Sequence, residues 1–397
     1  MRAALTMLGI VIGTGAVIAL LSIGQGAQQA ITEQIQGIGS NLIFVFPGQY
    51  SGGPGGTVRN WGPLTRQDAE AILNSPDTVH VAAVAPEIDR QIQATYRGET
   101  VDVTLTGTTP SYEFVRNFRP EYGEFFTVGD EAAAARVALL GAQTAKNLFG
   151  EPELALNATI RLNRVPFEVI GVLESKGGQG AFGRGSRDSL VIVPLATMQR
   201  RLFSSRYVGT RSQQVDMINI SAVDENSIDL AIDEIIWVLR ERHKIEYGED
   251  DFTVASQEDI LGVFNQITGY LTIFLGAIAG ISLVVGGIGI MNIMLVSVTE
   301  RTREIGIRKA VGAKRSHILW QFLIESIVLS IIGGLLGIGF GWAVSALVNT
   351  LDAFTTYVSP KAVVLAVSFS MAVGLFFGIY PASRAANLNP IEALRYE

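Results

Sequence analysis

The chain has 397 residues, of which 48% are hydrophobic and only 17% are charged, and its formal net charge is −7. Soluble domains carry about 25% charged residues, so this composition indicates a protein with large apolar segments. The acidic balance gives no support to nucleic-acid binding. The absence of cysteine excludes disulfides, thiolate metal sites and cysteine nucleophiles.

Four apolar segments are long enough to cross a bilayer, whose core takes about 20 residues of helix. The first follows a short basic start, which is also typical of a cleaved signal peptide, but three more segments downstream favour a retained span. Pro381 is expected to end the fourth segment, because a helix interior tolerates proline poorly. The predicted transmembrane helices are 1–23, 267–298, 318–348 and 362–380.

Lysine and arginine collect in the loop 299–316, between the second and third spans. Loops rich in these residues stay in the cytoplasm. Four spans then place both termini in the cytoplasm, with 381–397 as a tail, and put residues 24–262 outside. The predicted fold is an α-helical protein of the cell membrane (inner or plasma) with four transmembrane helices and a large extracytoplasmic mixed α/β domain between spans one and two.

The outer segment contains two predicted β-α-β units on either side of an insert with short strands. The first unit has strands at 41–46 and 79–84 around a helix at 65–73, which opens with a capping threonine. Alternation of apolar and polar residues predicts further strands at 91–96 and 101–106. The second unit has strands at 217–222 and 252–254 around a helix at 227–243, and predicted helices at 27–38 and 258–265 lead from and to the membrane.

Glycines recur every four residues in the third span, at Gly333, Gly337 and Gly341. Small residues at this spacing let membrane helices approach closely. The pattern predicts a packing face, either within the chain or between two copies of it.

Residue types that perform chemistry are sparse. His80, His243 and His317 are far apart in the sequence, and the acidic run 249–251 fits a solvated turn better than a calcium loop. The glycine-rich stretch 177–185 lacks the Lys-Ser/Thr of a phosphate-binding loop. We therefore predict no catalytic, cofactor-binding or metal-binding residues in this chain, and no enzyme activity of its own. The single acid of the third span, Glu325, is expected either to extend toward the cytoplasmic membrane surface or to pair with Arg315.

The loop after the second span predicts a short helix over 300–313, in which Glu304 and Arg308 form an i,i+4 pair. The block 304–313 (EIGIRKAVGA), the following 321–325 (QFLIE) and the terminal 381–397 (PASRAANLNPIEALRYE) resemble the MacB/FtsX-type permease family of ABC transporters. The start of the chain is also similar to the first span of that family. The family usually has an amphipathic helix before this span, whereas here only two residues precede the apolar run.

The resemblance implies a homodimeric permease in the lipid bilayer that works with a separate cytoplasmic ATPase, which holds the ATP and magnesium, and with an extracytoplasmic adaptor (a membrane fusion protein). It implies Porter-like halves at about 39–110 and 212–256, a Sabre-like insert at about 111–211, and stalk helices at 24–38 and about 257–266. Movement driven by ATP would pass through the coupling loop and the stalks to the outer domain and drive export or efflux. The implied coupling residues are Glu300, Arg301, Arg303, Glu304, Ile305, Gly306, Ile307, Arg308, Lys309 and Gly312.

Two other functions remain open from the sequence. Within the same family, a permease of the FtsX or lipoprotein-release type acts on envelope partners. From a different class, a membrane sensor or adhesion module would work without ATP. The coupling loop distinguishes the two classes, because only an ATP-driven permease needs a docking site for an ATPase.

Overall fold

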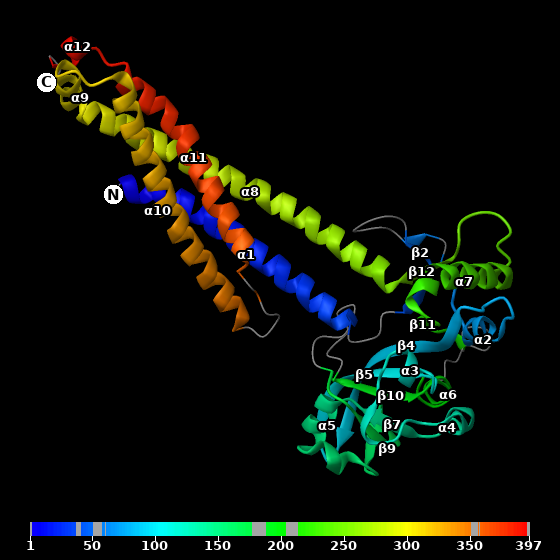
Figure 1. Cartoon of the computed structure of the whole chain (residues 1–397). Coiled ribbons are helices and arrows are strands. Elements are labelled where there is room, and N and C mark those ends of the chain that lie inside the picture. Colours follow the sequence, from blue (N-terminus) through cyan, green and yellow to red (C-terminus); the bar gives the residue numbers. More distant parts are fainter. Residues whose placement is uncertain are drawn as a thin grey trace. The chain divides into compact units, whose positions relative to one another are not determined.

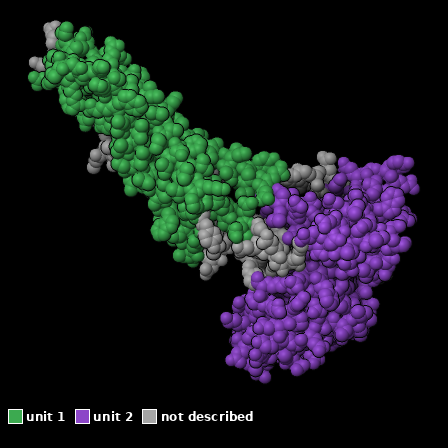
Figure 2. Space-filling view, viewed as in Figure 1, with its two compact units in different colours: residues 1–30, 265–397 green, residues 31–264 purple. Residues whose placement is uncertain are grey.

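The computed structural model describes residues 2–36, 41–50, 58–59, 61–176, 188–203, 213–350, 356 and 358–394. The predicted stretch 177–185 lies outside them. The chain forms two compact units, coloured separately in Figure 2. Unit 1 comprises Met1–Ala30 and Asn265–Glu397, and unit 2 comprises Ile31–Phe264.

Unit 1 is helical. Among the described residues, four helices are long and apolar enough to cross a membrane, which agrees with the predicted fold class. Each has a mean hydropathy near 2 over its apolar window, as a lipid-facing helix requires. The four are α1 (Arg2–Gln36), α8 (Gln257–Glu300), α10 (Arg315–Asn349) and α11 (Pro360–Ala386); the short helices are α9 (Thr302–Ala310) and α12 (Pro390–Leu394).

Helix α11 continues through Pro381 to Ala386, so the expectation that the fourth helix ends at this proline is wrong. A proline inside a helix removes one backbone hydrogen bond. Beyond it, Ala382 and Ala385 are fully buried in a core cluster that also contains Ile305 of α9. The packing of this last turn offsets the lost hydrogen bond.

Unit 2 is a mixed α/β domain built on one large sheet. At one end of the sheet the strand order is β12-β1-β11-β4, and all neighbours are antiparallel. In chain order these strands and their helices run β-α-β and again β-α-β, which is the split β-α-β arrangement. The elements are β1 (Leu42–Pro47), α2 (Arg66–Asn74) and β4 (Val81–Tyr96), then β11 (Met217–Ala222), α7 (Ile228–His243) and β12 (Phe252–Ser256).

The strands predicted at 79–84 and 91–96 are one long strand, β4. The expected break fails because the residues between them continue the ladder: pairing with β11 extends to Glu87, and pairing with β5 begins there. Pro86, which cannot donate a ladder hydrogen bond, lies just before the pairing with β5 begins at Glu87. There β4 has a partner on one side only, which is where a strand tolerates proline.

The remaining strands extend the same sheet in the order β5-β10-β7-β9-β6, with β8 pairing to β4 and β9. Short helices connect them. The strands are β5 (Glu99–Thr108), β6 (Pro120–Gly123), β7 (Val137–Leu140), β8 (Thr159–Leu162), β9 (Val165–Leu173) and β10 (Leu190–Pro194). The helices are α3 (Tyr112–Val115), α4 (Val128–Ala133), α5 (Ala142–Phe149), α6 (Leu195–Thr197), the 3₁₀ turns η1 (Pro152–Ala155) and η5 (Glu225–Ser227), and the π-helical turn η3 (Met198–Leu202); β2 (Gln49–Tyr50) and β3 (Val58–Arg59) pair separately.

The core of unit 2 lies on both faces of the sheet. Ile43 and Val45 of β1 belong to the larger cluster, whereas Leu42 and Phe44 belong to the smaller one. This split follows from the strand geometry, because successive side chains point to opposite faces. Helices α2 and α7 contact each other and neighbouring strands, and they contribute to the larger cluster.

Candidate functional site

Helix α9 forms the centre of the predicted coupling loop and is shorter than the expected 300–313. It starts after a turn at Arg301, and Thr302 donates its hydroxyl to the carbonyl oxygen of Val298 at 2.9 Å. It ends before Gly312, whose φ of +108° is a left-handed conformation that glycine adopts without strain. The chain then enters α10. The loop is therefore a defined helix between two sharp turns.

The inner face of α9 is anchored in unit 1. Ile305 is 2% exposed and shares a core cluster with Val298, Ile318 and Phe322, from the ends of α8 and α10. Gly306 is also buried, next to α12. The contacts of Ile305 fix α9 to the ends of long apolar helices, and Gly306 packs against the short helix α12.

Ion pairs and hydrogen bonds add to this anchoring. Glu304 and Arg308 form the predicted i,i+4 pair at 2.5 Å, and Arg308 also donates to Gln321 of α10 at 2.7 Å. Glu325 pairs with Arg301 at 3.3 Å and not with Arg315 as expected. The pairing with Arg315 is wrong because Arg315 and Glu325 are ten positions apart on α10, about 15 Å along the axis.

Lys309 connects α9 to the end of α11, a role that the sequence did not suggest. Its ammonium group donates to the carbonyl oxygens of Ala386 at 2.7 Å and Leu388 at 2.6 Å. The last carbonyls of a helix lack partners within the helix, so a lysine there satisfies them. Partial removal from water, followed by the charge of Arg315, lowers the pKa of Lys309.

The outer face of α9 remains open in this chain. Glu300, Arg303, Glu304 and Arg308 are exposed, and so are the aliphatic side chains that follow. Ile307 is 49% exposed and Val311 is 84% exposed. A rigid helix with aliphatic and charged side chains directed outward has the composition of a protein-docking surface.

The predicted glycine face lies against α1 of the same chain. A methyl group placed on Gly333 would come within 3.0 Å of Ile10, and one on Gly341 within 2.7 Å of Ile18. At Gly337 it would overlap the hydroxyl of Thr14. These three glycines therefore let α10 approach α1 closely, and the structure places them in packing within the chain.

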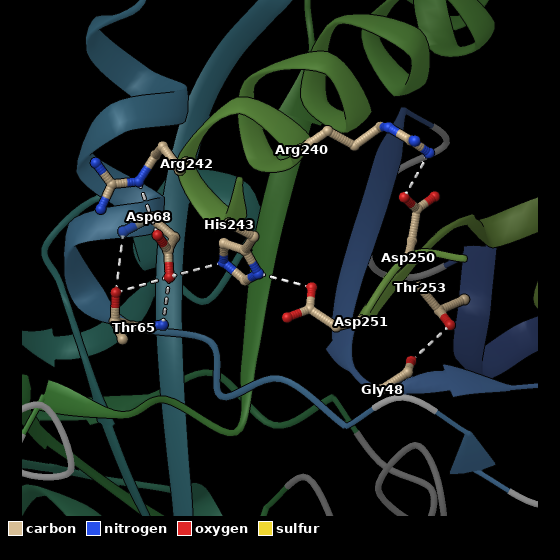
Figure 3. A network of polar contacts seen from close by, with 9 residues as sticks. All are labelled: Gly48, Thr65, Asp68, Arg240, Arg242, His243, Asp250, Asp251 and Thr253. Atoms are coloured by element: carbon tan, nitrogen blue, oxygen red, sulfur yellow. Dashed lines mark hydrogen bonds and ion pairs between the residues drawn. The ribbon is translucent and has the colours of Figure 1, made fainter. Parts of the chain in front are cut away.

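A polar network in unit 2 was missed by the sequence analysis (Figure 3). The ring of His243 lies between two carboxylates: Nδ1 is 2.7 Å from Oδ1 of Asp251, and Nε2 is 3.5 Å from Oδ2 of Asp68. Asp68 also accepts from Arg242 at 2.8 Å and from the backbone and hydroxyl of Thr65. This histidine clasp joins α2 of the first β-α-β unit to α7 and the start of β12 in the second.

The clasp changes the protonation of its members. Burial alone would raise the pKa of Asp68, but hydrogen bonds from His243, Thr65 and Arg242 outweigh burial and hold that pKa well below its usual value. The hydrogen bond to Asp68 raises the pKa of His243, against burial and with help from Asp251. The acidic run 249–251 is therefore not simply a solvated turn, since Asp250 also pairs with Arg240 at 2.7 Å. The basic last turn of α7, which precedes this acidic run in the sequence, could have indicated that the two segments form ion pairs.

A second buried network lies where β4 passes from β11 to β5. Glu87 is 4% exposed and accepts from Asn219 at 2.6 Å. Burial, then the charge of Asp89, raises the pKa of Glu87 to about 8, against the lowering effect of Arg116. Among the described residues, no group of three or more His, Asp or Glu side chains is arranged to hold a metal ion.

The chain matches the MacB-like periplasmic core domain over residues 3–236 and the FtsX-like permease C-terminal region over residues 276–390. It is 40% identical over 399 residues to the macrolide export ATP-binding/permease protein MacB of Bdellovibrio bacteriovorus, covering 100% of this chain and 59% of that protein. It is 38% identical over 402 residues to the uncharacterized ABC transporter permease YknZ of Bacillus subtilis, covering 100% of this chain and 96% of that protein. The periplasmic region of MacB from Actinobacillus actinomycetemcomitans aligns with a TM-score of 0.47 at 20% identity, covering 59% of this chain and 97% of that structure.

Four apolar helices, with an α/β domain between the first two and an FtsX-like C-terminal region, define an ABC transporter permease with an extracytoplasmic domain. The chain belongs to the MacB-like family of these permeases. The resemblance carried by 304–313 and 381–397 is thereby confirmed. The chain spans 59% of the length of the Bdellovibrio relative.

Proposed function

We propose that this chain transmits ATP-driven movement from a separate cytoplasmic ABC ATPase to its outer domain and thereby drives export. ATP and magnesium would bind to that ATPase, and two copies of this chain would act together with an extracytoplasmic adaptor. The alignment with YknZ, which covers 96% of that permease, supports a permease chain distinct from its ATPase. The names of the MacB relatives support export as the process that is driven.

One observation carries the proposal: α9 is fixed on its inner face and open on its outer face. Ile305 packs among the ends of α8, α10 and α11, and Lys309 holds the end of α11. A force applied to Val311 or Arg303 would therefore move the long helices with α9 instead of bending the loop. Packed helices shift as discrete elements, which suits them to this transmission.

The test is a pair of variants on the outer face, Val311→Glu and Arg303→Glu, in the tagged full-length chain. Both side chains are exposed, so the fold should tolerate the changes. We expect each variant to lose most of the ABC ATPase that the wild-type chain retains on purification, and to lose transport in cells. Tyr247→Glu is the matched control, because this exposed aromatic residue lies in the outer domain. If both variants retained as much ABC ATPase as the wild-type chain does, the docking role of α9 would be refuted.

The proposed orientation can be tested on the same surface residues. The chain has no cysteine, so single cysteines at Val311 and Tyr247 can be labelled without background. We expect an impermeant maleimide to label Tyr247→Cys in intact spheroplasts, and to label Val311→Cys only after the membrane is opened. Mass spectrometry of the other retained chains separates an export adaptor from the envelope partners of an FtsX-type permease. Labelling of both positions from outside would exclude coupling to a cytoplasmic ATPase through α9.

A further inference from the structure

Helix α12 carries part of the C-terminal motif, to which the coupling function assigns no role. It lies beside α9 at one end of the helices of unit 1 (Figure 1). The contact is close because Gly306 has no side chain: a methyl group there would come within 2.8 Å of Cβ of Ala393. Ala393 is 2% exposed, so α12 is packed onto α9 along this line.

The position of α12 is fixed by the same residue that anchors α9. Lys309 binds the carbonyl oxygens of Ala386 and Leu388, immediately before α12. Asn389 then accepts from the backbone of Ile391 at 3.2 Å through its side chain, which starts the short helix. The two helices α9 and α12 are thus held together as one surface, defined here as the α9–α12 platform.

The platform exposes aliphatic side chains from both helices. On α12, Ile391 is 70% exposed and Leu394 is 44% exposed. On α9, Ile307 is 49% exposed and Val311 at its end is 84% exposed. The same two helices carry exposed charges of both signs, including Arg303 on α9 and Glu392 on α12. Protein interfaces combine apolar contacts with polar and charged side chains in this way.

The size of α9 indicates that it cannot be the whole docking surface. Its nine residues make a rod about 14 Å long. A stable protein interface needs about 800 Å² and roughly 20–30 residues on each side. A partner seated on the outer face of α9 must therefore extend over neighbouring surface, and α12 lies in van der Waals contact with it.

We propose that α12 forms the second half of the docking surface for the ABC ATPase, with Ile391 and Leu394 as contact residues and Lys309 as the positioning residue that holds the platform together. The inference rests on the proposed function, since it assumes that α9 docks the ATPase. It adds that the C-terminal segment binds the same subunit.

The test uses the tagged full-length chain and the ABC ATPase that it retains, identified by mass spectrometry and purified. The measurement is the ATPase concentration that half-saturates the chain in detergent. Ile391→Glu and Leu394→Glu each place a charge at a proposed contact with the ATPase, and we expect about tenfold weaker binding for each. Tyr247→Glu should bind like the wild type, and an unchanged thermal melting temperature shows that each variant is folded.

The outcomes separate the two proposals. If Val311→Glu weakens binding while both α12 variants bind like the wild type, the α12 inference is overturned and the role of α9 stands. If Val311→Glu and Arg303→Glu also bind like the wild type, docking through α9 fails as well. A photo-crosslinking amino acid at Ile391 gives a second measurement in cells. Crosslinks to the ATPase support the platform, whereas crosslinks only to lipid or to a second copy of this chain overturn it.

Discussion

The histidine clasp makes the stability of the outer domain depend on pH, and His243→Gln tests this. Glutamine carries no charge, and both of its N–H donors are on one nitrogen, so it cannot reach carboxylates on two sides as the imidazole ring does. In the folded domain the histidine side chain is 10% exposed, with one short bond of 2.7 Å to Asp251 and a longer contact of 3.5 Å to Asp68. A hydrogen bond to a charged group contributes about 1.5–3 kcal/mol. Since the second contact is long, we expect a total loss of about 2–3 kcal/mol in the free energy of unfolding at pH 6.

The sign of the pH dependence follows from the two shifted pKa values. The pKa of His243 is raised, so its contribution is fully present below about pH 6.5 and is lost as pH rises through the raised value. The pKa of Asp68 is lowered, so its contribution is present above about pH 4 and is lost as pH falls through the lowered value. The clasp therefore stabilises most between about pH 4 and pH 6.5.

The assay is thermal unfolding of the full-length chain in detergent from pH 5.5 to 9, followed by tryptophan fluorescence, because Trp61 and Trp237 both belong to unit 2. A domain of this size loses about 2–4 °C per kcal/mol, so His243→Gln should melt about 4–12 °C lower at pH 6 and show a smaller deficit at pH 9. His80→Gln is the control: His80 also contacts a carboxylate, Glu234, at 2.6 Å, but its side chain is 35% exposed. A deficit that stays constant over this pH range, or equals that of the control, would refute the role assigned to the clasp.

The other two predictions concern the second buried network and the glycine face. Because the pKa of Glu87 is raised to about 8, the folded domain keeps a proton that the unfolded chain releases near pH 4.5, and stability falls between these values as pH rises. Glu87→Gln should reduce this fall, so the melting temperature of the variant should decrease less than that of the wild type between pH 5 and pH 8. Equal decreases of both melting temperatures would contradict the prediction. Gly337→Val should destabilise the helical unit by about 1–3 kcal/mol through overlap with Thr14, whereas Gly339→Val, with nothing within 4 Å, should leave the melting temperature unchanged.

Local patterns in the sequence were sufficient to locate most of the long helices and the strands. Apolar length identified the four long helices, and alternation located β11 at 217–222. The failures arose where distant packing outweighs a local signal. Pro381 does not end α11 because alanines beyond it are buried against α9. The strands predicted at 79–84 and 91–96 are one strand because pairing with β11 and then with β5 continues across the residues between them.

The polar networks could not be read from the sequence for the same physical reason. The clasp joins Asp68 to Arg242, which are 174 positions apart. No local periodicity connects them; they meet only because α2 and α7 pack on one face of the sheet. The coupling loop was easier to find, because the ordered motif 304–313, which resembles the family, lies in one short segment. Even there, the bonds from Lys309 to the end of α11 required the fold.

The strand register bears on the proposed transmission, because α8 leaves the sheet directly from its edge strand, β12. Helix α8 begins at Gln257, directly after β12, and β1 follows α1. Strands β1 and β12 are antiparallel neighbours with Ile43 opposite Ser256, so both helices join the sheet at the same end of one strand pair. Strand β12 is the outermost strand, and a pull on α8 would load its hydrogen bonds to β1 first. At the opposite end, the backbone of Asp251 accepts from Gly48, and its side chain binds His243. The clasp therefore connects this end of the β1–β12 pair to α2 and α7. If α8 moves as proposed, the two β-α-β units would move together, and β12 would not separate from β1.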